Sequence, residues 1–248
     1  MRRLSDPLTS LLTYQFAPTT FQIGFLETRL SKAAETYEHW HGRLANEYRT
    51  QFSKRATTGG LRDCLRQLEP LTTPQDHDLI IETESPWVAF FTNGSRVPDV
   101  VSPVGELCRL IECRGLAVRC IPDRHSGNSK QPCTFGCVSF DLFSPHKTEW
   151  LNVERSVCSM NDGGRWKFWA RGTPQIYEEI DRYRERRIID RFTPDMLSRY
   201  CKALGLRAFD WDFYGGNGII GIHPIAELAD GSKPERLSMS EARDRLFL

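Results

Sequence analysis

Residues 87–122 read WVAFFTNGSRVPDVVSPVGELCRLIECRGLAVRCIP, and the changes of pattern along them are the best guide to the fold. The opening run, WVAFFTN, is short and rich in β-branched and aromatic residues, which predicts a strand. Ser102 as a cap, Pro103 at the first helical position and Gly115 just past the end are start and stop signals of a helix. The closing run, LAVRCIP, predicts a second strand. We therefore expect a strand–helix–strand unit over residues 87–122.

Upstream of this unit the chain has the pattern of a long amphipathic helix, within residues 27–52. Apolar and aromatic residues recur there at steps of three and four, as on one face of a helix. They are Leu30, Ala33, Ala34, Tyr37, Trp40, His41, Leu44 and Tyr48. A second, short helix is expected in LRDCLRQLEPL, and DLIIETE, at residues 78–84, predicts a further strand.

Downstream, the pattern is that of an antiparallel meander. The runs CTFGCVSFDLFSP, EWLNVERSVC and RWKFWARG predict three strands, the first with a bulge at Gly136. The pair Asp162-Gly163 between the last two predicts a tight hairpin turn. Helical spacing is expected to continue over residues 176–192, and TPDMLSRYCKALGL predicts a helix capped by Thr193. GIIGIHP then predicts a late strand, and SMSEARDRLFL a last short helix.

These elements together predict an α+β fold, with a mixed, mostly antiparallel sheet and an N-terminal helical segment packed on it. We expect one domain over residues 1–248, with a helical N-terminal part at 1–75 and a sheet-containing core at 76–248. The alternative boundary makes residues 1–75 a separate helical lobe.

Composition excludes several classes of partner. Lys and Arg number 33 against 32 Asp and Glu, for a net charge of +1, so the basic excess of a nucleic-acid-coating protein is absent. No stretch reaches about 18 apolar residues, so no membrane span is expected. The N-terminus lacks the apolar run of a signal peptide, which predicts a cytoplasmic protein. The eight cysteines are then expected to be reduced, buried thiols rather than disulfides.

The segment DFYGGNGIIGIHP contains a literal G-x-G-x-x-G, formed by Gly216, Gly218 and Gly221. A dinucleotide fingerprint needs a helix to open after the glycines, because the helix N-terminus holds the pyrophosphate. Here a β-type run and Pro224 follow. The glycines therefore predict a hairpin or bulge before a buried strand, and no cofactor.

No metal site is predicted from local spacing. His39 and His41 lie two residues apart in a predicted helix, so their side chains point about 200° apart and cannot easily share one ion. The cysteines show no C-x2-C knuckle of the structural zinc type.

Recognised catalytic motifs are absent as well: there is no G-x-S-x-G, H-E-x-x-H or Walker A sequence. Glu82 and Glu84 would share one face of a strand and could form an acid–base pair, although solvated surface charge is the commoner outcome. The run RYRERRIIDR carries five arginines with interleaved acids, which favours a solvated, salt-bridged face. RWKFWARG places a Trp on each face of its strand, so Trp169 is a candidate contact for a partner.

Four stretches together carry a resemblance: WVAFFTNG, SPVGELCRLIECRGLAVRCIPD, SPHKTEWLNVERSVCSMNDGGRWKFWARG and RFTPDMLSRYCKALGLRAFDWDFYG. They look like a group of uncharacterised bacterial cytosolic proteins, over about residues 80–220. The scatter of such proteins across distant bacteria suits immunity proteins encoded beside secreted polymorphic toxins. The resemblance implies a non-catalytic protein that neutralises a cognate toxin by binding it. It transfers no residue roles.

The sequence thus favours a protein-binding module over an enzyme. Expected partner contacts lie in two polar loops, Asn93 to Asp99 and Asp123 to Lys130, and on one strand; they are Asn93, Arg96, Asp99, Asp123, Arg124 and Trp169. Charge reversal at Arg96 or Asp123 is expected to weaken the complex without unfolding the protein. The alternatives are an enzyme of unrecognised class that uses carboxylates or a thiol in a cleft, and a scaffold or regulatory module.

Overall fold

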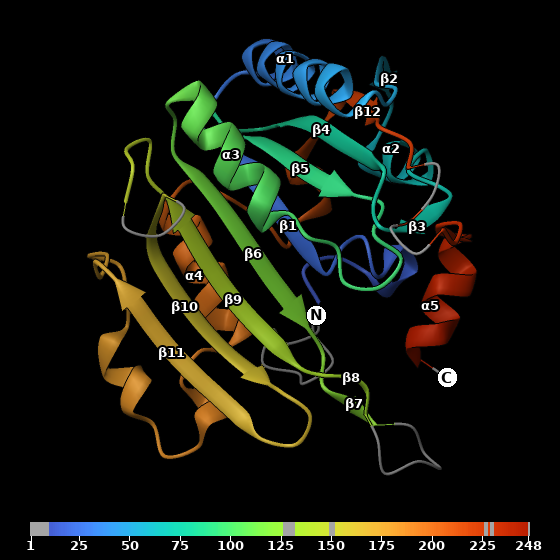
Figure 1. Ribbon diagram of the computed structural model, residues 1–248. Helices are drawn as coiled ribbons and strands as arrows, with labels where there is room; N and C mark the ends of the chain where they lie inside the picture. Colours follow the sequence, from blue (N-terminus) through green and yellow to red (C-terminus); the bar gives the residue numbers. More distant parts are fainter. Residues whose placement is uncertain (1–9, 126–131, 149–151, 226–227, 229–230, 248) are drawn as a thin grey trace.

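The structure, a computed structural model, describes residues 10–125, 132–148, 152–225, 228 and 231–247. Its centre is a nine-stranded sheet with the strand order β11-β10-β9-β6-β1-β5-β4-β12-β2, and helices pack on it (Figure 1). Each strand pairing described in this sheet is antiparallel. The α+β fold predicted from the sequence is therefore confirmed.

The strands of the large sheet are β1 (Gln22–Leu26), β2 (Ser53–Thr58), β4 (His77–Thr83), β5 (Val88–Thr92), β6 (Gly115–Ile121), β9 (Cys137–Phe143), β10 (Val153–Asn161), β11 (Trp166–Gly172) and β12 (Tyr214–Ile222). Two small sheets pair β3 (Leu71–Thr73) with β13 (Glu235–Leu237), and β7 (Arg124–His125) with β8 (Pro132–Thr134). The helices are α1 (Leu30–Tyr48), α2 (Leu61–Arg66), α3 (Val101–Ile111), α4 (Pro194–Ala203) and α5 (Met239–Phe247). Short 3-10 turns are η1 (Tyr14–Phe16), η2 (Ile180–Arg184), η3 (Ile188–Asp190) and η4 (Trp211–Phe213).

The predicted strand–helix–strand unit forms β5, α3 and β6, but a third strand separates its two strands. β1 lies between them and pairs antiparallel with both, with Gly24 opposite Phe90 on one side and Ala117 on the other. β5 and β6 therefore run in the same direction and leave the sheet at the same edge. A side chain at Gly24 would lie 2.4 Å from Val104 of α3, so this glycine lets the helix approach the sheet closely.

Both predicted ends of α3 differ from the structure. The cap is not Ser102: the Asp99 carboxylate accepts hydrogen bonds from the backbone N–H of Val101 at 2.9 Å and of Ser102 at 3.3 Å. The helix ends at Ile111, and Glu112 after it adopts the left-handed conformation with φ 60°. Gly115 is instead the first residue of β6. Glycine is needed there because a Cβ would lie 2.0 Å from the sulfur of Cys108.

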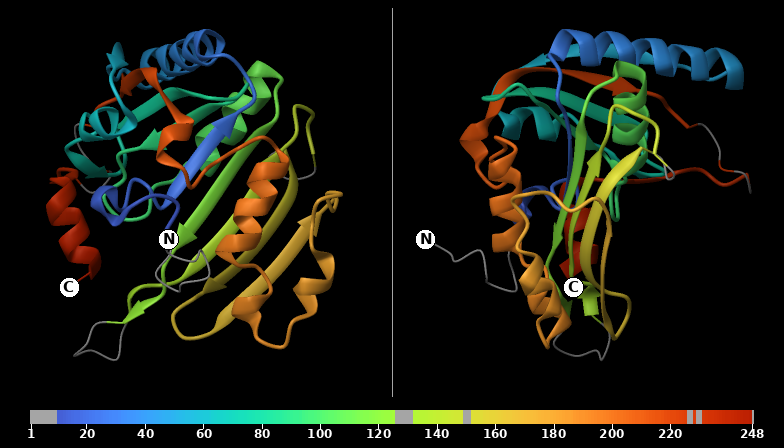
Figure 2. Two further views of the ribbon diagram at one scale, coloured as in Figure 1. Left: turned by 180° about the vertical axis from the view of Figure 1, so that it is seen from behind. Right: turned by 90° about the vertical axis from the view of Figure 1, so that its left-hand side faces the viewer.

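Helices cover both faces of the sheet (Figure 2). On one face α1 and α3 pack on a cluster that includes Tyr37, Phe90 and Leu107. On the other, α2 and α4 pack on a larger cluster that includes Leu65, Phe91 and Leu197. The sheet is therefore the middle of three layers, which explains why its central strands are buried on both sides.

Two expectations about secondary structure need correction. The N-terminal part, residues 1–75, contributes β1 and β2 to the sheet beside its helices, and the sequence does not predict β2. The helix expected over residues 176–192 is replaced by the turns η2 and η3, with Ile176 and Ile180 exposed instead of packed. A buried ion pair fixes the start of this segment: Arg155 of β10 holds Glu178 through two hydrogen bonds of 2.8 and 2.6 Å.

The strongest local signals are confirmed. β10 and β11 form the hairpin predicted from Asp162-Gly163, and Gly163 has a φ of 102°. The Thr193 side chain caps α4 by accepting a hydrogen bond from the backbone N–H of Met196. None of the helices in the described part of the chain has the length and apolar character needed to cross a bilayer.

Candidate metal centre

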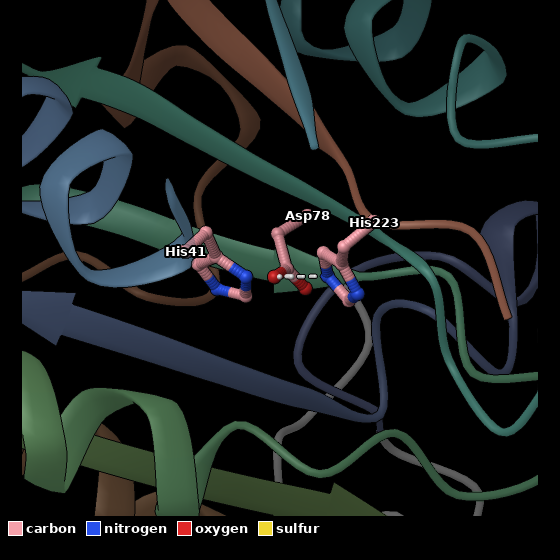
Figure 3. Close-up of side chains that lie close together, drawn as sticks. All are labelled: His41, Asp78 and His223. Carbon is pink, nitrogen blue, oxygen red and sulfur yellow. Dashed lines mark hydrogen bonds and ion pairs between the residues drawn. The ribbon is translucent and has the colours of Figure 1, made fainter. Parts of the chain in front are cut away.

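Three side chains from distant parts of the chain converge where α1 crosses one end of the sheet (Figure 3). His41 comes from α1, Asp78 from the start of β4, and His223 directly follows β12. One ligand atom from each residue lies within 4.8 Å of the other two. Asp78 is almost fully buried, and the two histidines are half-buried.

The amphipathic face of α1 positions His41. Tyr37 and His41 are one helical turn apart and therefore lie on the same face, with ring centroids 4.3 Å apart. His39 points away from the sheet and is exposed, as the predicted angle between the two histidines requires. The His41 ring also stacks on His223, with centroids 4.6 Å apart and planes at 23°.

The glycine-rich segment makes room for this arrangement, and its three glycines lie within β12. The register of β12 against β4 shifts between Tyr214 and Gly218, so the first glycines form the predicted bulge. Gly221 pairs with Asp78, and a Cβ on it would lie 2.3 Å from the Tyr37 ring. The third glycine of the apparent fingerprint is thus needed to seat Tyr37 beside Asp78.

One oxygen of Asp78 is held by the protein and the other is not. Its Oδ2 accepts a 2.7 Å hydrogen bond from the Tyr37 hydroxyl and lies 3.0 Å from Nε2 of His223. Its Oδ1 is buried and has no hydrogen-bond partner among the described residues, and the same is true of Nε2 of His41. Buried polar atoms without partners are costly, so each one needs an explanation.

The two histidines have opposite protonation tendencies. Burial, reinforced by the nearby His223, lowers the pKa of His41 to about 4, so this imidazole is neutral and has a free lone pair near pH 7. Burial also acts to lower the pKa of His223, but the hydrogen bond and charge of Asp78 outweigh it and the net shift is upward. Burial and the adjacent Asp78 raise the pKa of Tyr37, which keeps its hydroxyl a donor.

A second polar network anchors the start of β4. The Asn93 amide oxygen accepts hydrogen bonds from the backbone N–H of Asp76 at 2.9 Å and His77 at 3.0 Å, and its NH₂ donates to Asp76 at 2.7 Å. The backbone carbonyl of Asp76 in turn accepts a 2.9 Å hydrogen bond from the backbone N–H of His223. Asn93 is fully buried, so the prediction that it contacts a partner is wrong: it positions the strand that carries Asp78.

Of the remaining predicted contacts, Arg96 and Asp99 are exposed and follow β5. Asp99 caps α3 and also binds the hydroxyl of Ser102 at 2.7 Å, so it has a structural role of its own. Arg96 lies beside Val97, which is 49% exposed.

The second predicted loop and Trp169 lie elsewhere on the sheet. Asp123 accepts hydrogen bonds from the backbone N–H of Gly136 at 2.9 Å and from Asn161 at 3.1 Å, so reversing its charge would disturb the fold. Arg124 lies over the Tyr14 ring, 5.0 Å from its centroid. Most of the rest of that loop, residues 126–130, lies outside the described part of the chain. Trp169 is half-buried on β11 and donates to Ser156 at 3.3 Å.

The structure does not join the six predicted contacts into one surface. The segments after β5 and β6 leave the same edge of the sheet, but Trp169 lies on the outermost strand, with β10 and β9 between it and β6.

Two of the buried thiols and the Glu82–Glu84 pair are poorly suited to catalysis. Burial raises the pKa of Cys201 to about 12 and that of Cys120 still further, which disfavours the reactive thiolate. None of the seven cysteines with described side chains forms a disulfide with another described residue. Glu82 lies in β4 and accepts a hydrogen bond from Asn217, whereas Glu84 lies beyond the strand and pairs with Arg207. The two glutamates therefore do not act as a pair.

The His41, Asp78 and His223 cluster, in contrast, has the donors of a transition-metal site. Zinc is bound tetrahedrally by imidazole nitrogen and carboxylate oxygen at about 2.0–2.2 Å, so two ligand atoms on one ion lie about 3.4 Å apart. The three ligand atoms found here lie within 4.8 Å of one another, so the side chains would have to draw closer together to hold the ion. The two partnerless atoms, Nε2 of His41 and Oδ1 of Asp78, are a nitrogen and an oxygen donor of the required kinds.

Sequence analysis missed this site because its members are far apart in the chain. The only local signals are a charged residue at the start of the otherwise apolar strand DLII, and histidines on the inner face of α1 and at the end of β12. Comparison of the chain with protein-family models, curated proteins and solved structures found no match. The resemblance to immunity proteins stays a prediction, and the site is assigned from its geometry alone.

Proposed function

We propose that this protein binds one divalent transition-metal ion of the zinc class through His41, Asp78 and His223. The observation that carries the proposal is the convergence of three donors from three elements, two of them with buried atoms that have no partner. Imidazole donors favour zinc, copper, nickel or iron over magnesium and calcium, which prefer oxygen.

Three ligands, counted among the described residues, leave a coordination position for another molecule, as in catalytic zinc sites. Structural zinc sites in contrast use four protein ligands. The site therefore suits an ion that binds or activates a small molecule. The open position supports the alternative that the protein is an enzyme, whereas the sequence alone favours a protein-binding module.

The test compares metal binding by the full chain and by two histidine variants. His41→Asn removes a proposed ligand, while His39→Asn makes the same change two residues away on the exposed face of α1. Titration calorimetry with Zn²⁺ is expected to show one site in the wild type and unchanged binding in His39→Asn. Binding in His41→Asn should be weaker by more than the about 10–100-fold that loss of an outer-shell partner costs. Equal affinities in both variants would overturn the proposal.

Binding of a protein partner is a second candidate function, and exposed Arg96 beside the half-exposed apolar Val97 favours it. Arg96→Glu is the direct test, because the Arg96 side chain has no assigned role in the fold. A cognate toxin captured by the wild type and lost by Arg96→Glu would support this function. Capture at full yield by the variant would remove this loop from the interface.

A further inference from the structure

The outer edge of β11 carries backbone groups that nothing in the described part of the chain binds. β11 is the first strand in the order of the large sheet, and β10 is its neighbour there (Figure 1). At one end of this pairing the backbone N–H of Asp162 donates to the carbonyl of Arg165, and at the other end the N–H of Thr173 donates to the carbonyl of Glu154, both at 3.1 Å.

These two bonds fix which residues of β11 face β10. Every second residue of an antiparallel strand bonds to the same neighbour, so the odd-numbered residues from 165 to 173 bond to β10. The N–H and C=O groups of the residues between them point outward in the plane of the sheet. Three of these have no backbone hydrogen bond to any described residue: Trp166, Phe168 and Ala170.

The charge around this edge is positive. The turn η2 packs on β11, with the rings of Tyr183 and Phe168 centred 5.2 Å apart. Each acid of residues 162–191 except Asp181 is in an ion pair. Four exposed arginines of the same segment have no ion pair with a residue that the structure describes: Arg165, Arg171, Arg184 and Arg186. A molecule at this edge therefore meets an excess of positive charge.

The other outer strand of the sheet, β2, differs in this respect. Its Lys54 pairs with Glu38, and its Arg55 donates to the side chain of Gln67. The cations of β2 are thus engaged within the protein, whereas those around β11 are available to a partner.

Two other occupants fit the edge of β11 poorly. A second copy paired antiparallel about Trp169 would place Lys167 opposite Arg171, and like charges directly opposite each other destabilise a strand pair. A nucleic acid would meet the arginines but would leave the free backbone groups of the strand without matching donors and acceptors.

We propose that the outer edge of β11 binds an extended, acidic segment of a partner protein, which adds one antiparallel strand to the sheet. Main-chain hydrogen bonds to the three free residues hold the segment, as in other complexes formed by strand addition. Lys167, Trp169 and Arg171 share one face of β11 because successive side chains alternate. The adjoining side chains of the segment are therefore expected to be acidic, apolar and acidic at alternate positions.

This inference does not depend on the metal centre. β11 begins the strand order, whereas β4 and β12, which carry or precede Asp78 and His223, lie near its other end. Each proposal can therefore fail without the other.

The experiment titrates the full chain into three dye-labelled heptapeptides and follows their fluorescence anisotropy. TETVTET has the expected acid–apolar–acid face, and TKTVTKT reverses its charges. The third probe is TETVTET with N-methyl groups on its third and fifth residues, which removes the N–H donors aimed at the edge but keeps the charge. TETVTET is expected to bind about tenfold more tightly than either of the others, because both the cross-strand charge pairs and the backbone hydrogen bonds contribute.

Two pairs of variants test the location. Arg171→Glu should weaken binding of TETVTET about tenfold and strengthen that of TKTVTKT. Arg43→Glu makes the same charge change at an exposed position of α1 and should alter neither affinity. Ala170→Pro removes one free N–H where an edge strand tolerates proline, and should also weaken binding of TETVTET. Ala170→Ser keeps this N–H and should bind as the wild type does.

The opposite results are equally clear. The proposal is overturned if TETVTET and TKTVTKT bind equally, if the N-methylated peptide binds as tightly as TETVTET, or if the folded wild type does not bind TETVTET at millimolar concentration. A dimer that Ala170→Pro dissociates would assign the edge to a second copy of the chain. A single-stranded oligothymidylate that binds where no peptide does, and is lost in Arg171→Glu, would assign it to nucleic acid. Either result also overturns the proposal.

Discussion

Gly221 and Tyr37 fit together so closely that a methyl group on the glycine would lie 2.3 Å from a ring carbon of the tyrosine. The contact joins β12 to α1 directly above Asp78, which the tyrosine hydroxyl binds. The position of the carboxylate, and with it the proposed metal centre, therefore depends on a residue with no side chain.

Gly221→Ala is accordingly expected to destabilise the protein by about 1–3 kcal/mol, the usual cost of overpacking a core, and to weaken Zn²⁺ binding. Urea unfolding and metal titration measure the two effects. Gly42→Ala is the control, because a Cβ there meets nothing within 4 Å; in a helix interior it should add about 0.5–1 kcal/mol. Equal effects of the two changes on stability would contradict the packing argument.

Addition of Zn²⁺ should stabilise the folded state, since the three ligands come together only on folding. At a free concentration one hundred times Kd, the free energy of unfolding should rise by about 2.7 kcal/mol. Thermal unfolding with and without the ion measures this rise, and a chelator should reverse it. The rise should be absent in His223→Asn; if that variant is stabilised as much as the wild type, the ion binds elsewhere.

The ion pair of Arg155 and Glu178 should be important for stability, because its side chains are only 4% and 0% exposed. Glu178→Gln leaves the buried guanidinium without a counter-charge and is expected to cost about 3–5 kcal/mol. The adjacent Glu179 pairs with Arg199 at the surface, so Glu179→Gln should cost less than about 1 kcal/mol. Chemical denaturation distinguishes the two, and similar losses would mean that burial of the pair is not what matters.

Asp141 should make the free energy of unfolding decrease as the pH rises. Burial raises its pKa in the folded state, although Ser156 and Arg119 act in the opposite direction. The folded state thus holds the proton more tightly than the unfolded state. The contribution of this carboxyl to stability is therefore complete below its unfolded pKa and is lost as pH rises through the folded pKa.

Asp141→Asn should remove this pH dependence, so that the variant gains on the wild type as the pH rises from about 4 toward neutrality. Urea unfolding over that range measures the difference, with Asp181→Asn at an exposed position as the control. A constant gap between variant and wild type across the range would show that Asp141 does not titrate differently on folding.

Local sequence signals predict most of the helices and strands, but not which strands lie next to each other in the sheet. Thr193 and Asp162-Gly163 act within a few residues, so the sequence reveals the helix start and the hairpin that they form. β1 is buried on both faces and has no alternating pattern, and β2 is an exposed edge strand with the polar sequence SKRATT. Neither strand has the hydrophobic period by which strands are identified.

The three residues of the candidate metal centre could not be grouped from the sequence for a related physical reason, since only folding brings them together. The angle between His39 and His41 correctly excludes a shared ion, but the partner of His41 lies at position 223. Asn93 begins the polar segment Asn93 to Asp99, which the sequence predicts to be a contact loop. Its amide instead satisfies backbone N–H groups of Asp76 and His77, which only the folded chain brings near.

The central place of β1 also has a consequence for how the chain reaches this structure. β1 is completed by residue 26, but the strands on either side of it are made only at residues 88–92 and 115–121. During synthesis, β1 therefore stays unpaired along both hydrogen-bonding edges, and exposed on both apolar faces, until these later strands have been made. The sheet therefore cannot grow outward from the N-terminus, and contacts so distant in sequence are slow to form. A nascent chain that stops before residue 121 exposes the centre of its own sheet, and exposed apolar surface with unpaired strand edges is prone to aggregate.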